Sequence, residues 1–238
     1  MITMKLTYEN SHLFLHTTHG KWLVDTGAPN SMSPSRSLTL KQDGYQRVFE
    51  VPSQYMGLSI AGLSDLVGVE FDGLLGTDIL NEFDIIWDIT AETMILTEAE
   101  MDPRAIGFQG NELELGNILG IPTLHTTIAG QHHTMFFDTG APYSYLNECP
   151  PSRLLPVKEV EDFLPGFGTF TTDLREISIQ MNQASYSLQT GELPTLISMS
   201  LSLAGSDGII GNEIMTNRRL GYFPRRNRML LECAASAI

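Results

Sequence analysis

Two copies of one short motif place matched carboxyl groups in the two halves of this sequence. Asp-Thr-Gly-Ala-Pro occurs at residues 25–29 and again at 138–142, each time directly after an apolar run. Two carboxylates about 3–4 Å apart repel by about 4–5 kcal/mol at an effective dielectric of 20, so such a pair holds one proton over a broad pH range. The ionised member can take a proton from water while the protonated member donates to a carbonyl oxygen. Asp25 and Asp138 are therefore candidates for adding water to an amide.

The motif belongs to a longer internal repeat. A second block, Asp-Gly followed by two aliphatic residues and Gly, occurs at residues 72–76 and 207–211, and its aspartates are expected to bond to turn backbone. A predicted pair of strands with a polar turn follows each block. Asp25 and Asp138 are 113 positions apart, whereas Asp72 and Asp207 are 135 apart, so the second unit is 22 residues longer between its motifs. Two such units can face each other across a pseudo-twofold axis.

The elements around the motifs read as strands. Short β-branched and aromatic runs alternate with Gly, Asn, Asp and Pro, which predicts an all-β protein. One short helix per unit is expected after the second glycine block, at 77–83 and 212–217. Turn residues between positions 99 and 120 predict the boundary, which we place so that residues 1–105 form an N-terminal lobe and 106–238 a C-terminal lobe.

Each lobe also needs a hairpin if its half of the site is to be closed to water. In the first lobe Asp43 and Gly44 form a strong two-residue hairpin signal, with Tyr45 just beyond it and Tyr55 as an alternative aromatic residue. In the second lobe the glycine-rich tip contains Gly166, Phe167 and Gly168. An ordinary surface hairpin and a flap that covers a cleft remain equally open for both.

Composition excludes several classes of function. The chain has 238 residues, of which 42% are hydrophobic and 18% charged, and no apolar run approaches the ~20 residues of a membrane span. A formal charge of −14 disfavours nucleic acid and anionic membranes as partners. The first residues contain no apolar signal segment, so a cytoplasmic location is expected. His12, His16 and His19, like the adjacent His132 and His133, have no metal-site spacing, so neither a metal nor a cofactor is expected.

The doubled Asp-Thr-Gly, each followed downstream by two aliphatic residues and Gly, resembles the aspartic peptidases of the pepsin and retropepsin type. The resemblance covers most of both lobes, and residues 73–80 are most similar to retropepsins. It implies a bilobal, pepsin-like double β-barrel with pseudo-twofold symmetry, in which the chain ends pair in a sheet between the lobes. Asp25 and Asp138 would be the catalytic dyad.

The same resemblance implies roles for the residues beside the dyad. Thr26 and Thr139 would bond across the interface, and Gly27 and Gly140 would let backbone approach the carboxylates. Gly76 and Gly211 would belong to the strand that crosses under each loop. Where pepsins carry a hydroxyl residue after Asp-Thr-Gly, this chain has Ala28 and Ala141. Loss of that hydrogen-bond donor should raise the pKa values of the dyad and move activity toward neutral pH.

These features predict a monomeric aspartic endopeptidase that binds extended peptide or protein segments between its lobes. The alternative is a catalytically weak peptide-binding or regulatory module on the same fold. Retention of both Asp-Thr-Gly motifs favours the enzyme, since a binding module needs no matched dyad.

Overall fold

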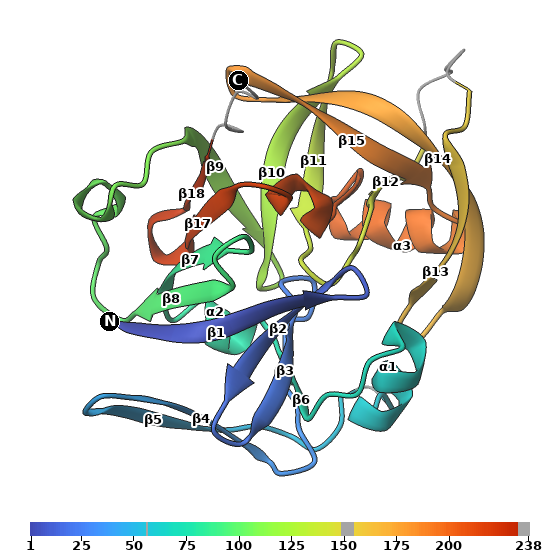
Figure 1. Cartoon of the computed structure of the whole chain (residues 1–238). Helices are drawn as coiled ribbons and strands as arrows, with labels where there is room; N and C mark the ends of the chain where they lie inside the picture. Colours follow the sequence, from blue (N-terminus) through green and yellow to red (C-terminus); the bar gives the residue numbers. More distant parts are fainter. Residues whose placement is uncertain (56, 149–154, 233–238) are drawn as a thin grey trace.

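The computed structural model describes residues 1–55, 57–148 and 155–232, and most of them lie in strands (Figure 1). The predicted predominance of β-structure is confirmed. No helix in these ranges is long and apolar enough to span a membrane. The strands of the N-terminal half are β1 (Ile2–Glu9), β2 (His12–Thr17), β3 (Gly20–Val24), β4 (Ser37–Gln42), β5 (Tyr45–Glu50), β6 (Gly73–Leu75), β7 (Asp84–Asp88) and β8 (Thr93–Thr97).

The C-terminal half repeats this series and extends it. Its strands are β9 (Asn111–Ile118), β10 (Ile121–Ile128), β11 (Gln131–Phe137), β12 (Ser144–Leu146), β13 (Lys158–Leu164), β14 (Gly168–Met181), β15 (Ala184–Glu192), β16 (Gly208–Ile210), β17 (Arg219–Phe223) and β18 (Arg228–Leu231). The 3₁₀ helix η1 (Pro103–Ile106) lies between β8 and β9, so the expected division after residue 105 falls within it.

The order of strands in the main sheet is nearly a palindrome. From one edge it runs β6-β3-β2-β1-β8-β7, and then β17-β18-β9-β10-β11-β16 repeats the first half in reverse. The centre is the antiparallel pair β7–β17, in which Trp87 lies opposite Leu220 and stacks on Tyr222 with ring centroids 5.4 Å apart. Both rings are fully buried. The two halves are therefore joined through a continuous sheet and a shared aromatic core.

The two ends of the described chain lie in this central sheet, although they do not pair with each other. The first strand, β1, pairs with β8, and the last strand, β18, pairs with β17 and β9. The expected sheet between the lobes is present, but the last residues of the chain, 233–238, lie outside the described residues, so their pairing is not described. The strands β7 and β17, which follow the second glycine block in each half, occupy the centre.

The expectation of one short helix in each half was too low. The predicted pair is present as α2 (Thr77–Leu80) and the 3₁₀ helix η2 (Asn212–Met215). Each half also contains a longer helix, α1 (Ile60–Val67) or α3 (Thr195–Ala204), and the short η3 (Pro224–Arg226) follows β17.

The sequence did contain a signal for α1. Ile60, Leu63 and Val67 are its buried residues and recur at the spacing of one helical face. The Ser59 side chain accepts a hydrogen bond from the Gly62 N–H at the start of the helix, and Gly68 ends it in the left-handed region with φ of 72°.

The longer spacing in the second unit has a structural counterpart. In the N-terminal half, β4 and β5 form a separate two-stranded sheet. In the C-terminal half, β13, β14 and β15 extend the main sheet, and β14 is 14 residues long. Figure 1 shows that β13 and β14 reach toward α1 of the other half, while β4 and β5 lie on a different side of the molecule.

Candidate active site

Equivalent strand crossings place Asp25 and Asp138. The parallel pair β3–β6 aligns Val24 with Leu75, and the Asp25 N–H donates to the Leu75 carbonyl at 3.0 Å. The parallel pair β11–β16 does the same in the second half, where the Asp138 N–H donates to the Ile210 carbonyl, also at 3.0 Å. Both aspartates therefore leave their strands in the same backbone geometry.

The glycines of the two motifs bring the carboxyl groups together. A Cβ atom on Gly27 would lie 2.3 Å from Oδ2 of Asp138, and one on Gly140 would lie 2.6 Å from Cγ of Asp25. Each loop thus packs its glycine directly against the carboxyl group of the other half. The two carboxyl groups lie close enough for each to affect the pKa of the other.

A reciprocal set of hydrogen bonds from the two threonines fixes this contact. The Thr26 hydroxyl donates to the Phe137 carbonyl at 2.7 Å and accepts from the Thr139 N–H at 2.9 Å. The Thr139 hydroxyl donates to the Val24 carbonyl at 2.8 Å and accepts from the Thr26 N–H at 3.0 Å. Both side chains are fully buried. The structure thus gives Thr26 and Thr139 the positioning contacts that the resemblance implied.

Burial and mutual repulsion govern the protonation of the pair. Each residue is partly exposed at the cleft, but protein surrounds its carboxyl group, and this burial raises the pKa of both Asp25 and Asp138. The charge of Asp138 raises the pKa of Asp25 further. Opposing this, the N–H groups of Gly27 and Gly140 each donate to the aspartate of their own loop at 2.8 Å. The balance keeps a shared proton on the pair to higher pH than on an isolated carboxyl group.

The second glycine block supports each loop from below. A Cβ atom on Gly76 would lie 2.7 Å from the Ala28 carbonyl oxygen, and one on Gly211 would lie 2.8 Å from the Ala141 carbonyl oxygen. Those same carbonyls accept hydrogen bonds from the first backbone N–H groups of α2 and η2. Gly76 and Gly211 therefore follow the crossing strands at points where side chains do not fit.

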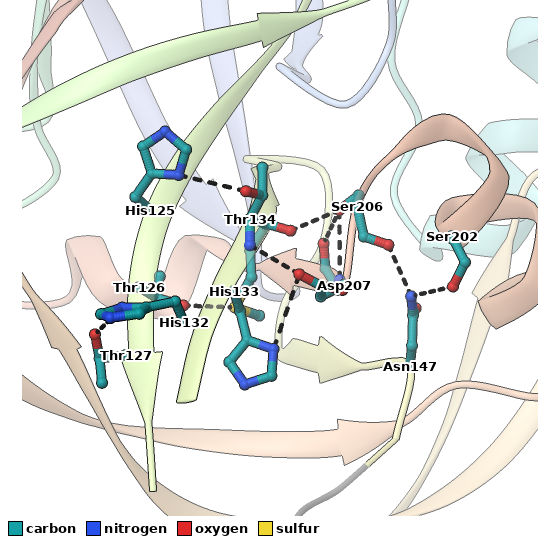
Figure 2. A network of polar contacts seen from close by, with 12 residues as sticks. His125, Thr126, Thr127, His132, His133, Thr134, Asn147, Ser202, Ser206 and Asp207 are labelled. Atoms are coloured by element: carbon teal, nitrogen blue, oxygen red, sulfur yellow. Dashed lines mark hydrogen bonds and ion pairs between the residues drawn. The ribbon is translucent and has the colours of Figure 1, made fainter. Parts of the chain in front are cut away.

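The aspartates of the second block are structural. Asp72 accepts a hydrogen bond from the Lys21 N–H at 2.8 Å, and Asp207 accepts one from the Thr134 N–H at 2.9 Å. Figure 2 shows the second of these within a network that includes Ser206. The predicted bonding of these aspartates to backbone is confirmed.

The histidines of Figure 2 do not form a metal site with Asp207. The closest, His133, has its Nδ1 atom 3.8 Å from an Asp207 carboxylate oxygen, while His125 and His132 bond to Thr134 and Thr127. Nowhere in the described part of the chain do three or more His, Cys, Asp or Glu side chains converge as metal ligands.

The dyad lies on the floor of a cleft of about 500 Å³. Ala28 and Ala141 border it beside the carboxyl groups, and the remaining walls are largely apolar. Side chains of the N-terminal half that contribute to the walls are Leu23, Met32, Tyr55, Leu58, Leu63, Val67 and Leu74. Those of the C-terminal half are Tyr145, Leu193, Ile209 and a hairpin described next. Such a cavity can take apolar side chains on either side of a polar reaction centre.

The β13–β14 hairpin closes one side of the cleft. Gly166 and Phe167 at its tip border the cleft as predicted, whereas Gly168 begins β14 opposite Leu164 and is not part of the wall. Phe163 reaches across and packs against apolar residues of the N-terminal half. The C-terminal half therefore supplies a flap.

The proposed flap at Asp43, Gly44 and Tyr45 was wrong. These residues do form the turn of a hairpin, β4–β5, but they are absent from the cleft walls. The Tyr45 hydroxyl donates to Glu98 at 2.9 Å, and Leu38 and Leu40 of β4 are fully buried in the main core. Burial of that face fixes the hairpin away from the cleft. The alternative, Tyr55, does border the cleft.

Two polar residues of the cleft wall were not predicted from the sequence. The Tyr145 hydroxyl donates to Asp162 of β13, and burial followed by this carboxylate raises the pKa of Tyr145. His12, the first residue of β2, also borders the cleft. Tyr145 and Met32 are equivalent in the repeat, since each lies seven residues after a dyad aspartate. That equivalence could be found in the sequence, but the contact of Tyr145 with a distant hairpin could not.

No protein-family model matches the sequence, and no curated protein is significantly similar to it. The geometry of the site is therefore the basis for its function. That geometry unites all eight of the dyad and dyad-support residues predicted from the sequence and one of the two predicted hairpins.

Proposed function

We propose that this protein is an aspartic endopeptidase that hydrolyses peptide bonds with a water molecule activated by Asp25 and Asp138. The observation that carries the proposal is the pair of adjacent carboxyl groups in the wall of an apolar cleft, with a loop glycine from the opposite half packed against each. The palindromic strand order around this pair also supports assigning the fold to the bilobal, pepsin-like double β-barrel.

The pair supplies the proton transfers of amide hydrolysis. The ionised carboxylate takes a proton from water as the water oxygen bonds to the amide carbon, and the protonated carboxyl donates its proton to the carbonyl oxygen. The resulting tetrahedral diol returns a hydroxyl proton to the newly ionised carboxylate. The other carboxyl protonates the amide nitrogen as the carbon–nitrogen bond breaks. Because the two groups titrate as a unit, the acid and base roles belong to the pair.

The cleft favours an extended peptide as substrate. Apolar walls from both halves flank the dyad, so side chains on either side of the scissile bond can be buried. The β13–β14 hairpin lies over the cleft and can exclude water from the reacting bond. Both aspartates come from one chain, so we expect a monomer to be sufficient, with specific activity unchanged on dilution.

A peptide library assayed between pH 3 and pH 8 tests the proposal. The wild type should cleave internal peptide bonds, whereas Asp25→Asn and Asp138→Asn should each lose at least about a thousandfold in kcat/KM, because a carboxamide cannot transfer the proton. Asp43→Asn is the matched control, since Asp43 lies in a turn outside the cleft. Equal inactivity of wild type and both dyad variants would reject the enzyme, and peptide binding without cleavage would favour the binding module.

A further inference from the structure

His12 is a buried polar residue in the apolar wall of the cleft. It begins β2, directly after the β1–β2 turn, and its exposed fraction is only 4%. Leu23 and Val67 of the same half border the cleft with it. The first residue of β10, which corresponds to His12 in the strand order of the other half, is Ile121. The N-terminal half thus has a polar residue at a position where the C-terminal half has an apolar one.

The hydrogen bonding of the ring determines its tautomer. Nδ1 lies 2.7 Å from the Asn10 carbonyl oxygen, which can only accept a hydrogen bond, so Nδ1 carries the hydrogen. In the neutral ring Nε2 therefore has a free lone pair. Nε2 is enclosed and has no hydrogen-bond partner among the described residues. A buried acceptor in this condition is costly unless some group donates to it.

The flap covers this ring. Phe163 of β13 is stacked on His12, with ring centroids 6.5 Å apart and planes inclined by 19°. The same phenylalanine packs against the apolar cluster of the N-terminal half. Phe163 would have to move away for a substrate side chain to reach the ring. A substrate side chain that replaces Phe163 there meets Nε2 among aliphatic neighbours.

We propose that Nε2 of His12 accepts a hydrogen bond from a substrate side chain with a neutral donor, a hydroxyl or a carboxamide. His12 would then determine specificity at one subsite of an otherwise apolar cleft. A neutral donor suits the site because an ammonium group would lose its hydration among apolar side chains at much greater cost. The inference rests on the proposed peptidase function, since the ligand is taken to be its peptide substrate.

Peptides in near-isosteric pairs test this subsite. Each position around the scissile bond is varied between Thr and Val and between Gln and Met, and kcat/KM is measured near pH 8 for every peptide. At one position the wild type should prefer the donor of each pair by about tenfold. His12→Asn should reduce the preference to within about twofold, because the Asn carboxamide can still donate to the Asn10 carbonyl but has no group at the place of Nε2.

Two controls separate recognition from folding. His19→Asn changes an exposed histidine outside the cleft walls and should keep the full preference. In the wild type, ¹⁵N NMR should show the Nε2 resonance of His12 shifting with the Thr peptide and not with the Val peptide, a measurement that needs no variant. Cleavage without preference, or preference retained by His12→Asn, would overturn the proposal.

If the protein is not a peptidase, the same peptides give a different result. If no peptide is cleaved, the dissociation constants of the same pairs are compared by competition binding. A tenfold preference for Thr over Val that His12→Asn removes would keep the subsite while rejecting the enzyme. Equal binding of both peptides would reject the subsite as well.

Discussion

The two halves of this protein share their strand order and the contacts that hold the dyad, and they differ in the walls and cover of the cleft. On both sides a threonine makes the same two side-chain hydrogen bonds, a glycine packs against the opposite carboxyl group, and a second glycine allows the strands to cross. Away from these contacts the halves diverge. The comparison teaches that a duplicated site tolerates change in its walls and cover but not in the contacts that bring the two carboxyl groups together.

The support beneath the loops is one place where the halves diverge. In the N-terminal half, Oδ1 of Asp78 accepts hydrogen bonds from the Ser31 N–H at 2.9 Å and from the Ser31 hydroxyl at 2.6 Å. The corresponding acid of the C-terminal half is Glu213, whose Oε1 atom is buried and has no partner among the described residues. Both acids therefore receive hydrogen bonds from the serine of their own half, Ser31 or Ser144, but one buried oxygen of Glu213 has no partner among the described residues.

The largest effect should come from filling the space between the loops. Gly27→Ala and Gly140→Ala each place a methyl group inside contact distance of the opposite carboxyl, so the dyad must separate, and kcat/KM should fall about a hundredfold or more in both. Gly62→Ala in α1 is the control, because its Cβ atom meets nothing closer than 3.5 Å. If either loop variant kept its activity, the two loops would not contribute equally to holding the dyad.

Next in size is the loss of the reciprocal threonine bonds. Thr26→Val and Thr139→Val each remove one buried donor and one buried acceptor, so each should lower the free energy of unfolding by about 2–4 kcal/mol in denaturant titrations. The double variant should lose less than the sum, since the bonds form one network. Thr3→Val, at an exposed position of β1, should change stability by less than about 0.5 kcal/mol. Unequal losses would show that one half dominates the contact.

A smaller effect is expected from the flap that only the C-terminal half supplies. Tyr145→Phe removes the hydroxyl that donates to Asp162 of β13, so the hairpin should be held less firmly over the cleft. KM should rise about three- to tenfold, with kcat changed by less than about twofold. Tyr45→Phe removes a comparable bond to Glu98 outside the cleft and should leave both parameters unchanged. A fall in kcat alone would argue against a role in closure.

The smallest effect concerns stability against pH. Burial raises the pKa of Glu213 to about 7 from an ordinary value of 4.5, so between these values the folded chain holds a proton that the unfolded chain releases. The stabilisation from this proton is complete below pH 4.5 and is lost as the pH rises through 7. Glu213→Gln stays neutral, so its Tm should gain a few degrees on the wild type between pH 4 and pH 8.

The matched control for this titration is Glu50→Gln, at an exposed position of β5. Its Tm profile should run parallel to that of the wild type. If the Glu213→Gln profile also ran parallel to the wild type, Glu213 would be no different from a solvated acid, and this contrast between the halves would disappear.

Local signals predicted more about elements than about where those elements dock. The Asp43-Gly44 turn correctly predicted a hairpin, but burial of Leu38 and Leu40 directs that hairpin away from the cleft. The helix α1 was missed although its buried residues follow a helical spacing. The place of His12 in the cleft wall had no local signal at all, because a histidine at the start of a strand gives no indication of the ring that will cover it.

The sequence by itself determined the dyad, its threonines and its glycines, because a repeated motif after a strand specifies the same local backbone twice, and equal units can pair across an axis. Only the tertiary structure decided which hairpin covers the cleft and which polar groups face it. Those outcomes depend on contacts between segments far apart in the chain, such as Phe163 over His12 and Tyr145 on Asp162. Such contacts follow from how whole faces are buried, which no short stretch of sequence encodes.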